Sequence, residues 1–249
     1  MNLPKFDVSR NWGVISEETQ KKIENSVVFT AGCGLGGLAV TFAARVGFRK
    51  FILADGDIVT PDNLNRQPFF VKHLGRNKAS ATAEIITEIN PEAEIKIYPK
   101  FLEGNLEGNE EIFHLIKESN FVINTVDPDE AFWEIHEIAR KLRRVELHPL
   151  NAGWWSFVYV SLPDSPSLDE VLGRRVYGYE LYQRLVSLAP QVDLPLEILK
   201  KMEKIVRGEL PFPQIATTSA VTAATVVNVM IEWLERGRLE KNPIVVKAL

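Results

Sequence analysis

Residues 27–37 read VVFTAGCGLGG, and this stretch decides the fold. Its first five residues are apolar or β-branched, as in a buried strand. The glycines Gly32, Gly34 and Gly37 then follow, and a helical stretch begins at residue 38. In a Gly-x-Gly-x-x-Gly turn between a strand and a helix, the missing side chains let the backbone approach a phosphate at the helix N-terminus. The stretch therefore predicts the opening strand, turn and helix of a nucleotide-binding α/β fold.

The alternation of strand and helix continues beyond this stretch. Continuous apolar strands separated by helix-length segments are typical of a parallel sheet covered on both faces. The expected strands are 27–31, 50–54, 94–98, 121–126 and 145–147, and the expected helices are 38–46, 78–89, 110–117 and 129–142. We predict a doubly wound, Rossmann-like α/β fold with a mostly parallel sheet. Its ligand is expected at the carboxyl ends of the strands ending at Ala31, Ala54 and Val126.

The C-terminal half elaborates this pattern. Residues 154–160 are aromatic and rich in β-formers, and we expect an added, antiparallel strand there. Short amphipathic helices are expected at 168–172, 179–188 and 196–206, a long uncharged helix within 213–231, and an edge strand at 242–246. We interpret residues 1–249 as one domain, with an N-terminal arm and helix over 1–25 and a crossover region over 164–213.

Composition excludes several classes of protein. The 249 residues carry 29 Lys plus Arg and 33 Asp plus Glu, a net charge of −4, so a nucleic-acid partner is not expected. Cys33 is the single cysteine, which excludes an internal disulfide and paired-cysteine zinc sites. The N-terminus has no apolar signal region, and the uncharged segment contains proline, threonine and asparagine. We therefore expect a cytoplasmic protein without a membrane span.

Asp55 ends the second strand and can accept hydrogen bonds from ribose hydroxyls. The glycine turn with this acid indicates a nucleotide, and taken alone it suits an NAD(P)-dependent oxidoreductase best. The next segment differs from dehydrogenase sequences. Residues 55–67 read DGDIVTPDNLNRQ, and Lys78 follows eleven residues later. This pattern resembles the E1-like ThiF/MoeB/HesA superfamily of adenylating enzymes, from about Arg10 to Gly153 and again in the helix near residues 213–228.

The resemblance implies a role for each matching residue. It implies ATP and Mg²⁺ as cofactors, with Asp55 on the ribose and Asp127 holding the metal. The residues expected around the triphosphate are Asn63, Arg66, Gln67 and Lys78, with Asp57 as a further nucleotide contact or a turn cap. This set also makes chemical sense alone, because attack of a carboxylate on the α-phosphorus needs neutralised phosphoryl oxygens. As isolated residues, Arg66 and Lys78 could equally be surface cations.

The family also implies a homodimer, in which an N-terminal arginine reaches the partner's ATP. Arg10 is the matching position, although it could equally anchor the N-terminal arm. Three features depart from the family pattern. Leu35 replaces a glycine of the loop, Pro128 follows Asp127 where many members have asparagine, and the zinc and acyl-accepting cysteines are missing. We interpret Cys33 as a small buried residue of the loop rather than as the missing acceptor.

These observations favour an ATP-dependent adenylyltransferase that activates a carboxylate, for example the C-terminus of a peptide or small carrier protein, without a thioester step. One alternative is a non-catalytic subunit that binds a nucleotide or a partner, which Leu35 and the absent cysteine favour. An oxidoreductase leaves residues 63–67, Lys78 and Asp127 unexplained. In the crossover region, Arg174 and Arg175 suggest an acidic or extended peptide substrate, together with the aromatic residues Tyr177, Tyr179 and Tyr182.

Overall fold

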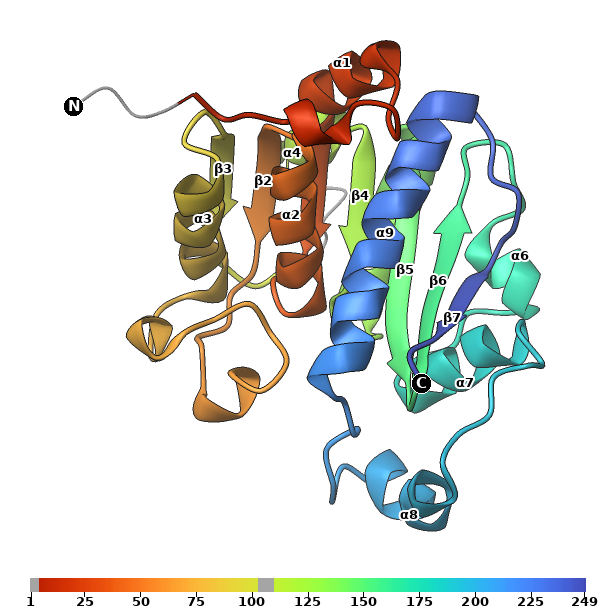
Figure 1. The fold of residues 1–249 in the computed structure, drawn as a ribbon. Helices are drawn as coiled ribbons and strands as arrows, with labels where there is room; N and C mark the ends of the chain where they lie inside the picture. The colour runs from red at the N-terminus through yellow and green to blue at the C-terminus, as the bar shows by residue number, and fades with distance from the viewer. Residues whose placement is uncertain (1–4, 103–109) are drawn as a thin grey trace.

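The computed structural model describes residues 5–102 and 110–249. In this part of the chain, one twisted sheet has the strand order β3-β2-β1-β4-β5-β6-β7 (Figure 1). The strands are β1 (Val27–Ala31), β2 (Lys50–Ala54), β3 (Glu94–Tyr98), β4 (Phe121–Asn124), β5 (Val145–Ala152), β6 (Trp155–Ser161) and β7 (Ile244–Lys247). Strands β1 to β5 are parallel, and β6 and β7 are antiparallel to their neighbours. The predicted fold class is confirmed.

Helices cover both faces of the sheet (Figure 1). The helices are α1 (Glu17–Asn25), α2 (Leu35–Val46), α3 (Lys78–Ile89), α4 (Glu110–Glu118), α5 (Glu130–Lys141), α6 (Leu168–Leu172), α7 (Tyr179–Ser187), α8 (Leu196–Val206) and α9 (Ala216–Arg236), with 3-10 turns at Ser9–Asn11, Pro61–Asn63 and Val71–His73. Apolar residues of α2, α3 and α9 form the core on one face. Those of α4 and α5, and then of α5, α6 and α7, form the core on the other. The order of strands places the reversal between β1 and β4, where ligands of such sheets bind.

Two predicted boundaries were wrong, and the first is the start of helix α2. Helix α2 begins at Leu35 rather than at residue 38, so Gly36 lies inside its first turn. A Cβ atom on Gly36 would lie 2.4 Å from Oγ1 of Thr30. The glycine therefore lets the helix start directly against β1, which a propensity scale cannot foresee.

Strand β5 was predicted only to residue 147, but it continues to Ala152, and all eight of its residues are buried. Pro149 and Asn151 obscured the strand in the sequence. Pro149 is tolerated because β4 pairs with β5 only as far as Leu147, so the proline needs to donate no ladder bond on that side. Asn151 is satisfied by side chains of α9, since its amide donates to Ser219 and accepts from Thr222. Tertiary partners thus extend the strand toward the site.

The uncharged segment near residues 213–231 forms most of α9, which crosses one face of the sheet (Figure 1). Its buried residues pack against α2 and the strands β5 and β6. None of the helices in the described ranges has both the length and the apolar character that crossing a membrane requires. The segment is therefore a core helix, as its threonines and asparagine predicted.

Candidate active site

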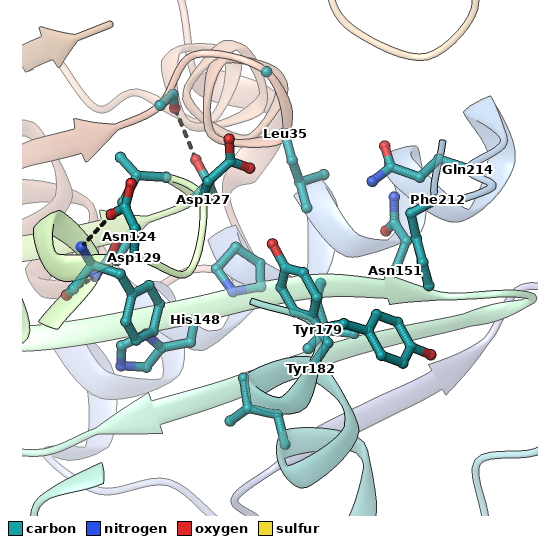
Figure 2. Close-up of a pocket in the computed structure, with 18 of the residues that line it drawn as sticks. Leu35, Asn124, Asp127, Asp129, His148, Asn151, Tyr179, Tyr182, Phe212 and Gln214 are labelled. Atoms are coloured by element: carbon teal, nitrogen blue, oxygen red, sulfur yellow. Dashed lines mark hydrogen bonds between the residues drawn. The ribbon is translucent and has the colours of Figure 1, made fainter. Parts of the chain in front are cut away.

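A cavity of about 680 Å³ opens at the carboxyl ends of β1, β2, β4 and β5 (Figure 2). Its wall combines the glycine turn, the segment after β2, the turn after β4 and the crossover region. The predicted site residues that line it are Gly32, Gly34, Asp55, Asp57, Arg66, Gln67, Lys78 and Asp127. The structure therefore gathers most of the predicted nucleotide site around one cavity.

The glycine turn presents bare backbone to this cavity. Gly32 has φ +87°, and a Cβ there would lie 2.8 Å from the carbonyl oxygen of Thr125. Gly34 is the N-cap of helix α2, and because it has no side chain it accepts no hydrogen bond from the N–H groups of the first turn. Those unsatisfied donors and the helix dipole favour an anion at this point. Leu35 lines the cavity beside them, so the departure from the family pattern does contact the ligand space (Figure 2).

Asp55 fixes the shape of the turn. One carboxylate oxygen accepts from the backbone N–H of Cys33 at 2.6 Å, and the other accepts from that of Asp57 at 2.8 Å. Partial burial raises the pKa of Asp55, and these hydrogen bonds oppose the rise. Cys33 itself is fully buried, and burial raises the pKa of its thiol well above the usual range. Cys33 is therefore a small buried residue of the turn, as predicted.

Two cations of the motif lie on the cavity wall. Nζ of Lys78 lies 2.9 Å from Oδ2 of Asp57, and its side chain is only 12% exposed. Arg66 donates from Nε to Oε1 of Gln214 at 2.8 Å and from an Nη to the carbonyl of Asp62 at 2.6 Å. Both cations are held in place by these contacts, as a site that neutralises phosphoryl charge requires.

Asp127 and Asp129 form an acidic edge beside the cations (Figure 2). Partial burial raises the pKa of Asp127, and the charges of Asp129 and Asp57 add to the rise. Asp129 is committed to capping α5, because its Oδ1 accepts from the backbone of Ala131 and Phe132. The carboxylate of Asp127 forms no hydrogen bond with any described residue. Carboxylates that repel one another beside a phosphate site fit Mg²⁺, a hard cation that prefers oxygen ligands.

Three predicted site residues lie elsewhere. Gly37 is buried within α2 and faces Thr82. Asn63 is buried and caps the Pro61–Asn63 turn by accepting from the N–H of Thr60, while its carbonyl accepts from Gln67. Asn63 thus shapes the segment that presents Gln67 to the cavity. Arg10 is exposed and lies on the N-terminal arm, so it does not reach the cavity of its own chain.

The arm is anchored by the neighbour of Arg10 instead. Asn11 donates to the carbonyl of Val46, at the end of α2, and to the side chain of Gln20. Helix α2 runs away from the glycine turn, so this anchor lies at the opposite end of the strands from the cavity (Figure 1). Arg10 therefore does not line the cavity of its own chain.

The crossover region supplies site residues that the motif did not reveal. Tyr182, Tyr179 and Phe212 line the cavity opposite Asp127, and both tyrosine rings lie within 6.4 Å of the Phe212 ring centre (Figure 2). Burial raises the pKa of Tyr182, and Asp127 and Asp129 raise it further, so its hydroxyl stays a donor. Pro128 helps to dock this region, because its carbonyl accepts from the N–H of Gly178 at 2.7 Å.

A buried polar cluster lies under the cavity floor. Glu146 is fully buried between His136 and His148, with Oε2 at 2.6 Å from Nδ1 of His136 and 3.3 Å from Nε2 of His148. Asn124 donates to its other oxygen at 2.9 Å. Burial alone raises the pKa of Glu146, but the two histidines outweigh this effect and hold it well below the usual range. Asn124 and His148 line the cavity and join the cluster to it.

Within the described residues, His136, Glu146 and His148 also form the one group whose ligand atoms lie close enough together to hold a metal ion. The hydrogen bonds indicate another role. Nε2 of His136 accepts from the backbone N–H of Leu168 at 3.1 Å, so its Nδ1 carries the proton donated to Glu146. A separation of 2.6 Å suits that bond and is short for two ligands of one metal ion. We therefore interpret the cluster as a hydrogen-bonded part of the core that stabilises the fold, and not as a metal site.

The fold and this cavity define a nucleotide-binding protein of the doubly wound α/β class. The model of the ThiF family matches residues 7–244, which is nearly the whole chain. The chain therefore belongs to the ThiF family, as the motif in residues 55–67 predicted.

Relatives and solved structures agree with this assignment. The adenylyltransferase and sulfurtransferase UBA4 of Saccharomyces cerevisiae is 27% identical over 136 residues, which cover 52% of this chain and 30% of UBA4. E. coli MccB solved with ATP has a TM-score of 0.67 and 16% identity, and PaaA has 0.67 and 19%. Both similarities cover 92% of this chain and 62% of the solved chain. The chain thus spans about a third of the curated relative and under two thirds of the solved structures.

Proposed function

We propose that this chain is an ATP-dependent adenylyltransferase that activates a carboxylate as an acyl-adenylate. The observation that carries the proposal is the placement of Arg66, Lys78 and Asp127 on one cavity with an uncapped helix N-terminus. A dinucleotide enzyme needs the glycine turn and Asp55 but has no use for this set. UBA4, an adenylyltransferase, and MccB, solved with ATP, support the same reaction.

In the proposed reaction, a carboxylate oxygen attacks the α-phosphorus of ATP and pyrophosphate leaves. Asp55 would hold the ribose, and the glycine turn would hold phosphate oxygens at the start of α2. Arg66 and Lys78 would neutralise the charge that grows on the phosphoryl oxygens. Asp127 would hold Mg²⁺, which supplies further neutralisation when bound. The Tyr182 hydroxyl would donate a hydrogen bond to the incoming carboxylate or to a phosphate oxygen.

An external nucleophile would then attack the carbonyl carbon of the acyl-adenylate directly, the bond from that carbon to the phosphate oxygen would break, and AMP would leave. Cys33 is the single cysteine of the sequence, and it is buried within the turn with a raised thiol pKa. A thioester at this position would require the phosphate loop to open. The proposed reaction therefore has no covalent acyl-enzyme step. The carboxylate that is activated belongs to a peptide or a small carrier protein.

Exchange of radioactive pyrophosphate into ATP tests the first step. We expect exchange that depends on both Mg²⁺ and an added carboxylate, and calorimetry should show ATP binding without one. Binding of ATP with no exchange for any carboxylate would favour a nucleotide-binding subunit without catalysis. Binding of NADH in place of ATP would overturn the proposal.

We further propose a homodimer in which Arg10 of one copy acts on the ATP of the other, because Arg10 lies at the opposite end of the strands from its own cavity. Subunit mixing tests this arrangement. Arg10→Ala and Asp127→Asn should each be inactive alone, since one lacks the arm cation and the other lacks the metal ligand. Mixed dimers contain one intact site, so a mixture should regain exchange. Failure to regain activity, or a monomer at micromolar concentration, would contradict a shared site.

A further inference from the structure

The sheet order divides the cavity into two ends. Asp55 and Lys78 belong to the side of β1 and β2, together with Phe101 after β3. On the other side of the β1–β4 boundary, the wall is built by β5 and the crossover region. We call this second part the acyl end and define it by Leu150, Leu185, Val186, Leu199, Met202 and Phe212. If ATP spans the first part, the acyl end is left for the carboxylate substrate.

The acyl end does not suit an acidic peptide. Among the described residues that line the cavity, the cations are Arg66 and Lys78, both from the nucleotide motif. Arg174 pairs with Glu180 at 2.8 Å, and Arg175 pairs with Glu137 and lies over the ring of Trp133. Neither arginine lines the cavity, so the charge that the sequence suggested for substrate binding is used within the protein.

Helix α8 shows that the apolar lining is incomplete without a ligand. None of its residues is buried. Leu199 lines the cavity and is still 51% exposed, while Leu196 on the same helix is 64% exposed and does not line it. Apolar side chains that converge on a cavity from one side gain burial when an apolar ligand fills it. The lining of Leu199 and Met202 is therefore suited to an apolar group.

We propose that the acyl end binds a bulky aliphatic or aromatic group next to the carboxyl carbon of the substrate. The substrate is then a peptide or acid that ends in a residue such as leucine or phenylalanine, rather than in a flexible glycine tail. This inference rests on the proposed function. It adds the chemical class of the carboxylate, which the nucleotide motif leaves open.

Pyrophosphate exchange with Gly-Gly-Gly, Gly-Gly-Leu and Gly-Gly-Phe as carboxylates tests the proposal. In a hydrophobic pocket, each additional methylene group of a substrate raises kcat/KM by about 10-fold or more. The kcat/KM of Gly-Gly-Leu and of Gly-Gly-Phe should therefore exceed that of Gly-Gly-Gly by at least this factor. Leu199→Asp should remove this advantage, chiefly by raising KM for the two apolar peptides, so that their kcat/KM falls to about that of Gly-Gly-Gly. Leu196→Asp places the same charge on the same helix outside the cavity and should behave as wild type.

Calorimetry of the same peptides, with the ATP analogue AMPCPP present, separates the two levels of proposal. Preferred binding of Gly-Gly-Phe without any exchange would support the acyl end and count against adenylation. Exchange or binding that favours Gly-Gly-Gly would overturn the apolar acyl end and leave adenylation standing. The apolar acyl end would also be overturned if Leu199→Asp lowered kcat/KM equally for all three peptides. The same holds if Leu199→Asp and Leu196→Asp had equal effects.

Discussion

Asp127→Asn should lower pyrophosphate exchange by about 10²–10³, because one preorganised charge at a phosphoryl-transfer site is worth roughly that factor. Lys78→Ala should cause a loss of the same order. If both residues act on one triphosphate, the double variant should be little worse than either single variant. A double loss equal to the product of the two single losses would indicate independent roles.

The stability of Asp127→Asn should move the other way. Because the folded protein raises the pKa of Asp127, folding favours its protonated form. The ionised carboxylate thus weakens folding as the pH rises above the ordinary value of 3.8, and the neutral asparagine removes both the cost of burying a charge and the repulsion from Asp129 and Asp57. Thermal unfolding at pH 7 should show an unchanged or slightly raised Tm. Asp164→Asn, an exposed acid outside the cavity, is the matched control for activity and should retain exchange.

Glu146→Gln should lower the free energy of unfolding by about 1–3 kcal/mol, the usual cost of leaving a buried hydrogen-bonding group unpaired, because the glutamine NH2 replaces one of the two oxygens that accept from His136 and Asn124. That is a large fraction of the stability of an ordinary domain. Glu146 is fully buried, and its ionised form holds His136, His148 and Asn124 together. Urea denaturation measures the change, and Glu17→Gln on the exposed first turn of α1 should stay within about 0.5 kcal/mol of wild type.

The pH dependence gives a second measurement of the same cluster. Because the folded state lowers the pKa of Glu146, its stabilising contribution is present above the ordinary value of 4.5 and is lost as the pH falls below it. The wild type should lose stability more steeply than Glu146→Gln on acidification below that value. Parallel stability curves for the two proteins would show that the cluster carries no ionised carboxylate.

Much of the nucleotide half could be predicted because its residues are close in sequence. The glycine turn directly joins β1 to α2, and residues 55–67 follow β2 without interruption. Their roles follow from local geometry: a strand end, a tight turn and a helix N-terminus. Asn63 marks the limit of this reasoning, since its motif position suggested a ligand contact whereas its side chain caps a turn. The position of Arg10 at the end of the strands opposite the cavity is likewise decided by the fold, and its role in a partner's site stays a prediction.

The sequence by itself determined the doubly wound α/β class, the ThiF motif, the buried role of Cys33 and the core helix near residues 213–231. The tertiary structure alone decided the full length of β5, the Glu146 cluster and the apolar acyl end. Leu168 bonds His136 across 32 residues, and Arg66 bonds Gln214 across 148. Partners so far apart in sequence leave no local sequence pattern. A buried polar side chain needs a hydrogen-bond partner, and an apolar one needs a packing partner, and only the tertiary fold determines which residues these are.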